Sequence, residues 1–402
     1  MVSIRKNLAI FALLCAGAAT WAAPGAGPAA AQADDSSPRL RLGGYVQLWY
    51  LNEQAKNGKL EDGTGDLGAQ IASGFAINRA RLQLGMEMGC LGASMQVRME
   101  GGSLNLLDAY GSWGIFGPAM VLRFGQMKVP SAWEVRVPDE GLDFVTRSRF
   151  ASEVVNWSLS KSTFSICPLY NVQTYSRDTG LSIEGEAAGF RYALMAGNGL
   201  GANNYVGADE SRGFVYANAY GAYFYGARAS YDVLTELRRM LSTLPASLEL
   251  GGHYNWNDHP NLIYSDAKTV LDLKRRSWSA DLSLRVWDRL RVSGMYGEGV
   301  IDDDYDHDGA TDYSYRGWEI RAMAVILPGA LEAGARYDSY AWNRAVTSGW
   351  TDAGALTVGV TWSVPPALRM QLNYKLKIVS GDLASNDSSS LVMLAAQVRL
   401  DN

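Results

Sequence analysis

The sequence has little cysteine or histidine, and after its first 33 residues it contains no long apolar run. Three cysteines and three histidines in 402 residues make a disulfide framework or a histidine-rich metal site a poor explanation of the fold. A membrane-spanning helix needs about 20 consecutive apolar residues, and none follows residue 33. Backbone groups find no hydrogen-bond partner in lipid, so a spanning structure in this chain would have to be a closed β-barrel.

The formal charge is −5, and a nucleic-acid partner is therefore not favoured. The first 33 residues have the pattern of a secretory signal peptide. Arg5 and Lys6 form a basic region, Leu8 to Leu14 is apolar, and Ala31-Gln32-Ala33 fits a cleavage site, with Ala29-Ala30-Ala31 as the alternative. We therefore expect an exported chain whose folded part is residues 34–402.

Apolar and polar residues alternate along segment after segment, which places one kind on each face of a strand. Leu82, Leu84 and Met86 share one face, whereas Arg81 and Gln83 lie on the other. The same alternation predicts sixteen strands. They lie near residues 39–51, 75–89, 91–101, 106–114, 119–129, 179–187, 189–197, 221–232, 246–257, 275–288, 289–300, 315–327, 330–342, 352–364, 367–379 and 390–400.

The connections alternate between tight turns, such as Gly89-Cys90 or Ile115 to Pro118, and long loops, such as 52–74. An even number of strands with short periplasmic turns and long outer loops is typical of barrels in the bacterial outer membrane. A soluble β-sandwich is the alternative, but its polar face would be outside and its apolar face hidden. Aromatic residues at strand ends, including Trp278, Trp318 and Trp362, favour the barrel because such rings belong at membrane interfaces.

The polar face of these strands carries many charges, with basic groups in excess. The basic side chains are Arg41, Arg79, Arg81, Arg98, Arg123, Arg228, Arg285, Arg291, Arg321, Arg336, Arg369, Lys375, Lys377 and Arg399. The acidic ones are Glu87, Glu100, Asp108, Glu184, Asp232, Glu249, Asp281, Glu319, Glu332 and Asp338. Guanidinium groups stay charged and bind carboxylate or phosphate oxygens, and rings of such groups bias a pore toward anions. Alternatively, each arginine pairs with a neighbouring carboxylate and stabilises the wall.

The segment 130–178 is much longer than a connecting loop needs to be, and we expect it to fold inward and narrow the pore. Lys128 precedes this segment, and its charged residues include Glu134, Arg136, Asp139, Glu140, Asp143, Arg147, Arg149 and Lys161. Opposed charges at a narrow point would orient dipolar solutes. An exposed loop folded over the mouth is the alternative.

The loop 301–314 is rich in aspartate. Asp304, Asp306, Asp308 and Asp312 match ligand positions of a calcium loop, but Tyr315 stands where a bidentate glutamate belongs. Two interpretations of this loop remain. It binds Ca²⁺ weakly, and the ion bridges to lipopolysaccharide, or it is a solvated acidic loop tip without an ion. No other cofactor is predicted.

Some barrels are enzymes, and His253 lies on the polar face of a predicted strand. A nucleophile needs a base and an orienting third group within hydrogen-bond reach, and the spacing indicates neither. The sequence therefore predicts no catalytic residue.

Several short stretches resemble the phosphate-selective porin O and P family of outer-membrane porins. These are Asn78-Arg79-Ala80-Arg81-Leu82, Leu106-Leu107-Asp108-Ala109-Tyr110, Leu122 to Pro130 with Glu134, Arg177 to Leu181 with Asn198-Gly199, Ala335 to Asp338, Leu356 to Val360, and Leu372 to Tyr374. The resemblance implies a sixteen-stranded, trimeric, anion-preferring channel with an arginine ladder and an inward third loop. Arg79, Arg81 and Arg123 lie within the matching stretches and are the first candidates for that ladder.

The sequence departs from the family in two places. Glu134, Asp139, Glu140 and Asp143 dilute the basic loop expected of a phosphate site, so phosphate is one possible solute among small anions. The chain also ends in Arg399-Leu400-Asp401-Asn402, without the usual aromatic residue. A different class of function remains open, in which the barrel is a sleeve for an exported partner such as an electron-transfer cytochrome.

Overall fold

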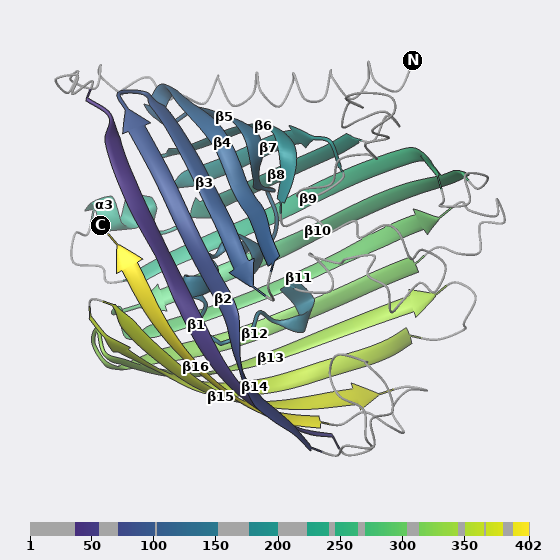
Figure 1. Cartoon of the computed structure of the whole chain (residues 1–402). Helices are drawn as coiled ribbons and strands as arrows, with labels where there is room; N and C mark the ends of the chain where they lie inside the picture. Colours follow the sequence, from purple (N-terminus) through teal and green to yellow (C-terminus); the bar gives the residue numbers. More distant parts are fainter. Residues whose placement is uncertain are drawn as a thin grey trace.

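Sixteen antiparallel strands form a single closed barrel in the computed structural model of the chain (Figure 1). The structure describes residues 37–55, 71–100, 103–151, 177–199, 223–240, 246–263, 270–303, 313–344, 350–365, 367–380 and 389–401. Each strand pairs with its neighbours in sequence, and β1 closes the barrel by pairing with β16. The predicted all-β class and strand number are confirmed.

The strand bounds match the alternation of the sequence, and most strands extend by a few residues at the long-loop end. They are β1 Arg39–Ala55, β2 Ile71–Met88, β3 Leu91–Glu100, β4 Ser103–Pro118, β5 Val121–Lys128, β6 Arg177–Ala187, β7 Phe190–Gly197, β8 Tyr223–Asp232, β9 Ala246–Ile263, β10 Val270–Val286, β11 Leu290–Asp303, β12 Tyr313–Leu327, β13 Leu331–Arg344, β14 Trp350–Val364, β15 Leu368–Ser380 and β16 Ser389–Asp401. Within the part of the chain that the structure describes, no helix has the length and apolar character needed to cross a membrane.

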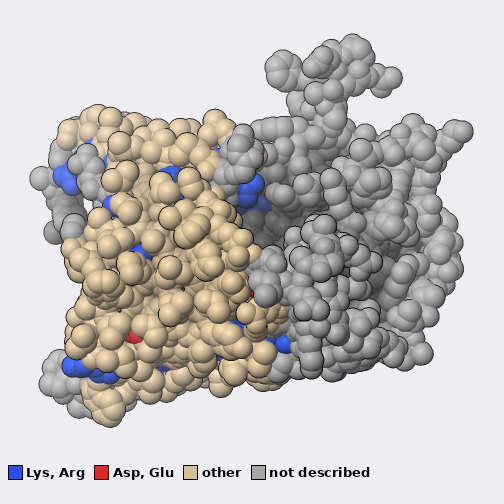
Figure 2. All heavy atoms as spheres, turned by 60° about the horizontal axis from the view of Figure 1, so that its bottom comes forward, with Lys and Arg blue, Asp and Glu red and all other residues tan. Residues whose placement is uncertain are grey.

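The exposed apolar residues of the strands face outward, and the polar residues face the interior together with some buried apolar ones such as Trp49 and Met393. Neighbouring residues of β15 illustrate this, because Leu372 is 52% exposed and Asn373 only 1%. A closed barrel without sheet edges satisfies every ladder hydrogen bond, and an apolar outer wall is stable only against lipid. On the face drawn in Figure 2, the described surface is mostly uncharged, with few Lys, Arg, Asp or Glu side chains.

Aromatic rings line the outside of neighbouring strands β9 to β12. Tyr254 lies opposite Trp278, and Tyr296 lies opposite Trp318. The Trp278 and Tyr296 rings also contact each other, with centroids 5.7 Å apart. These exposed rings form a girdle of the kind that marks a membrane–water interface.

Two connections at the tight-turn end can be compared with the sequence prediction. The turn predicted at Ile115 to Pro118 is confirmed, because the Ala119 N–H donates to the Phe116 carbonyl at 3.3 Å and closes a reversal over Gly117 and Pro118. Gly117 adopts a φ of +58°, which a residue with a side chain rarely adopts, as expected within a tight turn. The longer connection after β8 contains a short helix, α3 (Thr235–Met240), near the C-terminus in Figure 1.

Candidate functional site

The connection after β5 begins with a compact segment, residues 129–151. It contains two short helices, α2 (Trp133–Arg136) and η1 (Asp139–Gly141). Pro138 precedes η1, where its fixed φ is compatible with a helix start. The predicted end of this connection was wrong, because Arg177 and Asp178 already belong to β6. Its remainder, residues 152–176, lies outside the described residues.

Segment 129–151 is bonded to strands from several sides of the barrel. The Ser131 carbonyl accepts a hydrogen bond from Arg228 of β8 at 3.4 Å, and the Glu140 carbonyl accepts one from Arg369 of β15 at 2.6 Å. Val145 packs against the β1 and β16 residues Trp49 and Met393. The strands that contact the segment are β1, β2, β6, β8, β11, β12, β13, β15 and β16.

Glu134 is the centre of one cluster of charges. Arg321 of β12 donates to its carboxylate at 2.5 Å, and Arg336 of β13 lies 3.5 Å from the same oxygen. Ser148 adds two hydrogen bonds to the second oxygen, from its backbone N–H at 3.0 Å and its hydroxyl at 2.6 Å. Glu134, Arg321 and Arg336 are each no more than 3% exposed. Arg321 also bonds to Glu319 of its own strand.

Asp139 is the centre of a second cluster on the opposite side of the segment. Arg81 of β2 lies 3.1 Å from its carboxylate, Arg79 lies 3.8 Å away, and Arg147 of the segment lies 2.7 Å away. Arg79 also donates to the Val145 carbonyl at 3.1 Å and covers the Trp49 ring at 4.9 Å. Arg79 and Arg81 therefore hold the segment against β2.

Both carboxylates are ionised in this arrangement. Burial would raise the pKa of Glu134, but the Arg321 and Arg336 guanidinium groups outweigh burial and lower that pKa. Burial likewise opposes ionisation of Asp139, and Arg79, Arg147 and Arg81 hold its pKa well below the ordinary value. Each carboxylate thus keeps a negative charge that neutralises part of the arginine field.

The inner face of β15 holds the middle of the segment through neutral contacts as well. Arg369 and Gln371 donate to the Leu142 carbonyl at 2.8 and 3.1 Å. The Asn373 side chain accepts a hydrogen bond from the Val145 N–H at 2.7 Å. The sequence prediction did not select Gln371 or Asn373, although both share the strand face of Arg369 and would have been found by following that register.

The other predicted residues have varied surroundings. Arg123 pairs with Glu184 at 3.0 Å, and Arg136 lies 3.7 Å from the same carboxylate. Arg228 makes a two-pronged contact with Asp281 at 2.6 and 2.8 Å. Lys128 donates to the Arg136 carbonyl at 3.0 Å.

Four further predicted residues differ in exposure, and Arg98 lies opposite Arg81 in the pairing of β3 with β2. Arg98 is half-buried, Lys375 is buried and Arg285 is exposed. Arg149 reaches β13 through its backbone N–H, which donates to Asp338 at 2.9 Å. The predicted calcium residues Asp304, Asp306, Asp308 and Asp312 lie outside the described residues, and that site stays a prediction.

Two contacts of the wall were not anticipated. Arg177, placed in the loop by the prediction, forms a two-pronged pair with Asp108 at 2.9 and 3.1 Å. Arg291 joins Asp143 of the segment to Glu332 of β13, at 2.7 and 3.1 Å. For Asp108, Arg291 and Glu332, the only signal in the sequence is that each falls on the polar face of a predicted strand.

A family model described as Gram-negative porin matches residues 15–388. The fold is similar to that of an anion-selective porin from Comamonas acidovorans, with 15% identity over 90% of this chain and 100% of that one and a TM-score of 0.61. OmpT, an outer membrane protein of Vibrio cholerae, is 8% identical over 92% and 100% of the two chains, with a TM-score of 0.57.

The outer membrane channel DcaP of Acinetobacter baumannii is 10% identical over 91% of this chain and 98% of that one, with a TM-score of 0.55. At such identities the likeness to solved structures concerns the fold alone. No curated protein sequence matches the chain.

Proposed function

This chain belongs to the family of Gram-negative porins of the bacterial outer membrane, and on that premise we propose that it is a passive diffusion channel for small hydrophilic solutes, with a preference for anions. Segment 129–151 folds into the barrel in this proposal and forms the narrowest part of the pore. Transport is by diffusion, without turnover or cofactor.

The hydrogen bonds and ion pairs between segment 129–151 and strands around the barrel support the proposal that this segment narrows the pore. Strands β2, β8, β12 and β15 are far apart in the strand order, and one short segment can contact all of them only across the interior. Among the charged residues of these contacts, basic side chains outnumber acidic ones. The surplus supports a preference for anions, since charged rings in a pore select the opposite charge.

A dedicated phosphate site is a weaker proposal than a general preference for anions. Arg79, Arg81, Arg321 and Arg336 already bind Glu134 or Asp139, so these guanidinium groups are not all available to an oxyanion. Phosphate would pass as one small anion among others. The alternative function, in which the barrel encloses a cytochrome, is disfavoured because segment 129–151 would obstruct a folded partner.

The anion preference has a direct electrical test. The test uses a planar bilayer with about 0.1 M KCl on one side and a higher KCl concentration on the other. We expect the reversal potential to have the sign of the chloride equilibrium potential. The Debye length at about 0.1 M is about 10 Å, so the fixed charges still act on ions in the pore. Raising the salt on both sides should weaken the preference. A cation-selective channel, or no conductance, would contradict the proposal.

A cross-link tests the placement of segment 129–151. Val145→Cys with Asn373→Cys, in a background without Cys90 and Cys167, should form a disulfide, because the Val145 N–H lies 2.7 Å from the Asn373 side chain. On a non-reducing gel the oxidised product should migrate differently from the reduced form. Its single-channel conductance should be close to that of the unmodified chain.

The matched control moves the second cysteine to Leu372, whose side chain faces outward and is 52% exposed. Val145→Cys with Leu372→Cys should not cross-link under the same oxidation. Equal yields in the two variants would mean that the segment does not occupy this position.

Assembly and loop binding complete the proposal. A homotrimer is supported by the trimer form in which OmpT of Vibrio cholerae has been described, a protein 9% identical to this chain. Lipid and lipopolysaccharide would contact the outer wall, and the loop 301–314 would bind Ca²⁺ weakly through its aspartates.

A further inference from the structure

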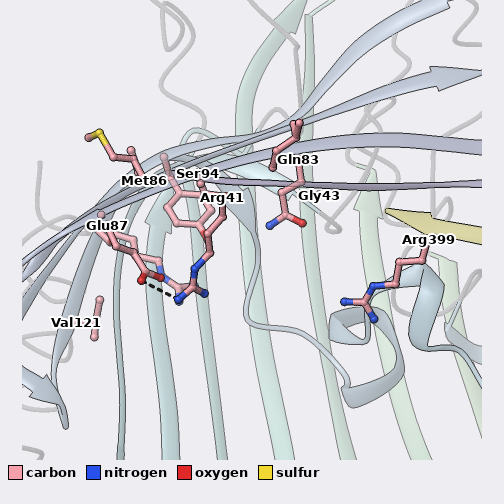
Figure 3. A pocket seen from close by; sticks show the side chains of 15 residues that line it. Arg41, Gly43, Gln83, Met86, Glu87, Ser94, Val121 and Arg399 are labelled. Carbon is pink, nitrogen blue, oxygen red and sulfur yellow. Dashed lines mark hydrogen bonds and ion pairs between the residues drawn. The ribbon is translucent and has the colours of Figure 1, made fainter. Parts of the chain in front are cut away.

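A cavity of about 480 Å³ lies against the wall formed by β1 to β5 and β16, toward the tight-turn end of the barrel (Figure 3). All of its lining residues come from strands or strand ends, and none belongs to segment 129–151. The cavity is therefore separate from the two charge clusters around Glu134 and Asp139.

Small residues create this cavity. Gly43, Gly85 and Gly92 lie on the inner face of β1, β2 and β3, and Ser94 lies opposite Gly85. A Cβ atom at Gly92 would lie 2.6 Å from the Ser112 hydroxyl, so even an alanine there would crowd the floor. The wall is thus hollowed where other strands carry large side chains.

The rim of the cavity is basic, with one carboxylate. Arg41, Arg123 and Arg399 line it together with Glu87. Arg41 and Glu87 are 3.0 Å apart, but their side chains are 66% and 54% exposed, so the pair is weak and easily opened. The Arg399 side chain is exposed on the neighbouring strand (Figure 3), and a guanidinium has five N–H donors, enough to bind a solute beside any other partner.

Neutral hydrogen-bonding groups lie between these charges. The Ser94 and Ser112 hydroxyls and the Gln83 amide line the floor and side of the cavity. Tyr110 presents its ring beside Arg123, whose guanidinium lies 5.2 Å from the ring centroid. Hydroxyls and amides both donate and accept, which suits a solute that carries several hydroxyl groups.

We propose that this cavity is a binding subsite for hydroxylated organic acids, in which the arginines bind the carboxylate and Ser94, Ser112, Gln83 and Glu87 bind the hydroxyl groups. The volume favours an organic solute over a bare ion, because pockets of about 300–1,000 Å³ hold ligands of drug size. This inference rests on the proposed function, because it specifies which class of solute the proposed channel would bind before release.

Saturation-transfer NMR on the full chain in detergent micelles tests the subsite without requiring conduction. The probes are gluconate, which has a carboxylate and hydroxyls, acetate, which has only the carboxylate, and glucose, which has only hydroxyls. We expect gluconate to bind at least about tenfold more tightly than either of the others. One charge-assisted hydrogen bond contributes about 1.5–3 kcal/mol, which is about tenfold or more.

Two variants test separately how the subsite binds the carboxylate and how it binds the hydroxyl groups. Arg399→Gln should weaken gluconate binding about tenfold, whereas Arg289→Gln, which removes an exposed charge from a turn at the same end, should leave it unchanged. Ser94→Ala with Ser112→Ala should weaken gluconate binding but not acetate binding.

The outcomes distinguish this inference from the proposed function. Equal binding of gluconate and acetate, or no effect of Arg399→Gln, would overturn the subsite even if the chain conducts anions. Absence of anion-selective conductance beside intact gluconate binding would overturn the proposed channel and leave the subsite standing. Loss of binding in Arg289→Gln as well would show a general charge effect and would also overturn the subsite.

Discussion

Glu134→Gln is expected to lower the free energy of unfolding by about 3 kcal/mol and to make the channel more anion-selective. Glu134 is 1% exposed and is bonded to two arginines that are themselves buried. Removing one partner of a buried ion pair typically costs about 3–5 kcal/mol, since the remaining charge has lost water without compensation. Glutamine keeps the shape of the glutamate side chain and one acceptor oxygen. The expected loss of unfolding free energy is therefore at the lower end of this range.

The selectivity should change because a negative charge leaves segment 129–151, the proposed constriction of the pore. Arg321 retains Glu319 and Asp143, but Arg336 retains only Asp338 as a charged partner among the described residues. Two unit charges about 4 Å apart in water interact by about 1 kcal/mol. The ratio of chloride to potassium permeability should therefore rise by up to roughly fivefold. Loss of the Ser148 contacts should also increase current noise.

Glu140→Gln is the matched control for this prediction. Glu140 belongs to the same segment and its side chain is half-buried. Among the described residues, it is the backbone carbonyl of Glu140 that accepts a hydrogen bond, from Arg369. This variant removes the same charge and should leave the midpoint of denaturant unfolding unchanged. If Glu134→Gln and Glu140→Gln were equally stable, Glu134 would not be an anchor of the segment.

The strands could be predicted from the sequence because each must present apolar groups to lipid and polar groups to the interior. This physical requirement disappears beyond the membrane, and there the prediction fell short. The strand predicted at 246–257 continues to Ile263, and the one predicted at 275–288 begins at Val270. Pro260 lies in that extension, where the ladder between β9 and β10 shifts its register, as expected of a residue without a backbone N–H.

The pairing of the charges could not be predicted in the same way. From the sequence, Glu134 and Asp139 dilute a basic loop, whereas in the structure they bind the wall arginines. The partners are distant along the chain, since Glu134 and Arg321 are 187 positions apart and Asp139 and Arg81 are 58 positions apart. Strand alternation gives the face of each arginine but not the height at which a loop carboxylate meets it. The sequence therefore predicts a strand face for each candidate arginine but not its ion-pair partner.

Arg79→Gln with Arg81→Gln should shift the reversal potential toward cations more than any other double substitution of the β2 wall. The change removes two positive charges, and it leaves Asp139 with Arg147 as its remaining ion-pair partner among the described residues. Because Arg147 still favours its ionised form, Asp139 remains negative. The cluster around Asp139 then changes from a net positive charge to no net charge, because only Arg147 and Asp139 remain of its charged members.

The size of this effect follows from the same electrostatics. Each charge contributes up to about 1 kcal/mol to the energy of an ion at about 4 Å in water, so two charges correspond to a change of up to roughly thirtyfold in the permeability ratio. The measurement is the reversal potential at about 0.1 M salt, where charges within about 10 Å are not screened. At about 1 M salt, where the Debye length is about 3 Å, most of the difference should disappear.

The double substitution to lysine separates charge from anchoring. Arg79→Lys with Arg81→Lys keeps both charges but loses the planar fork of donors, including the bond from Arg79 to the Val145 carbonyl and its contact with the Trp49 ring. Selectivity should then stay near that of the native chain, while the yield of the Val145–Asn373 cross-link falls. If lysine and glutamine variants shifted the reversal potential equally, the arginines would act by holding segment 129–151 in place rather than by their charge, and the preference for anions would have to arise elsewhere on the wall.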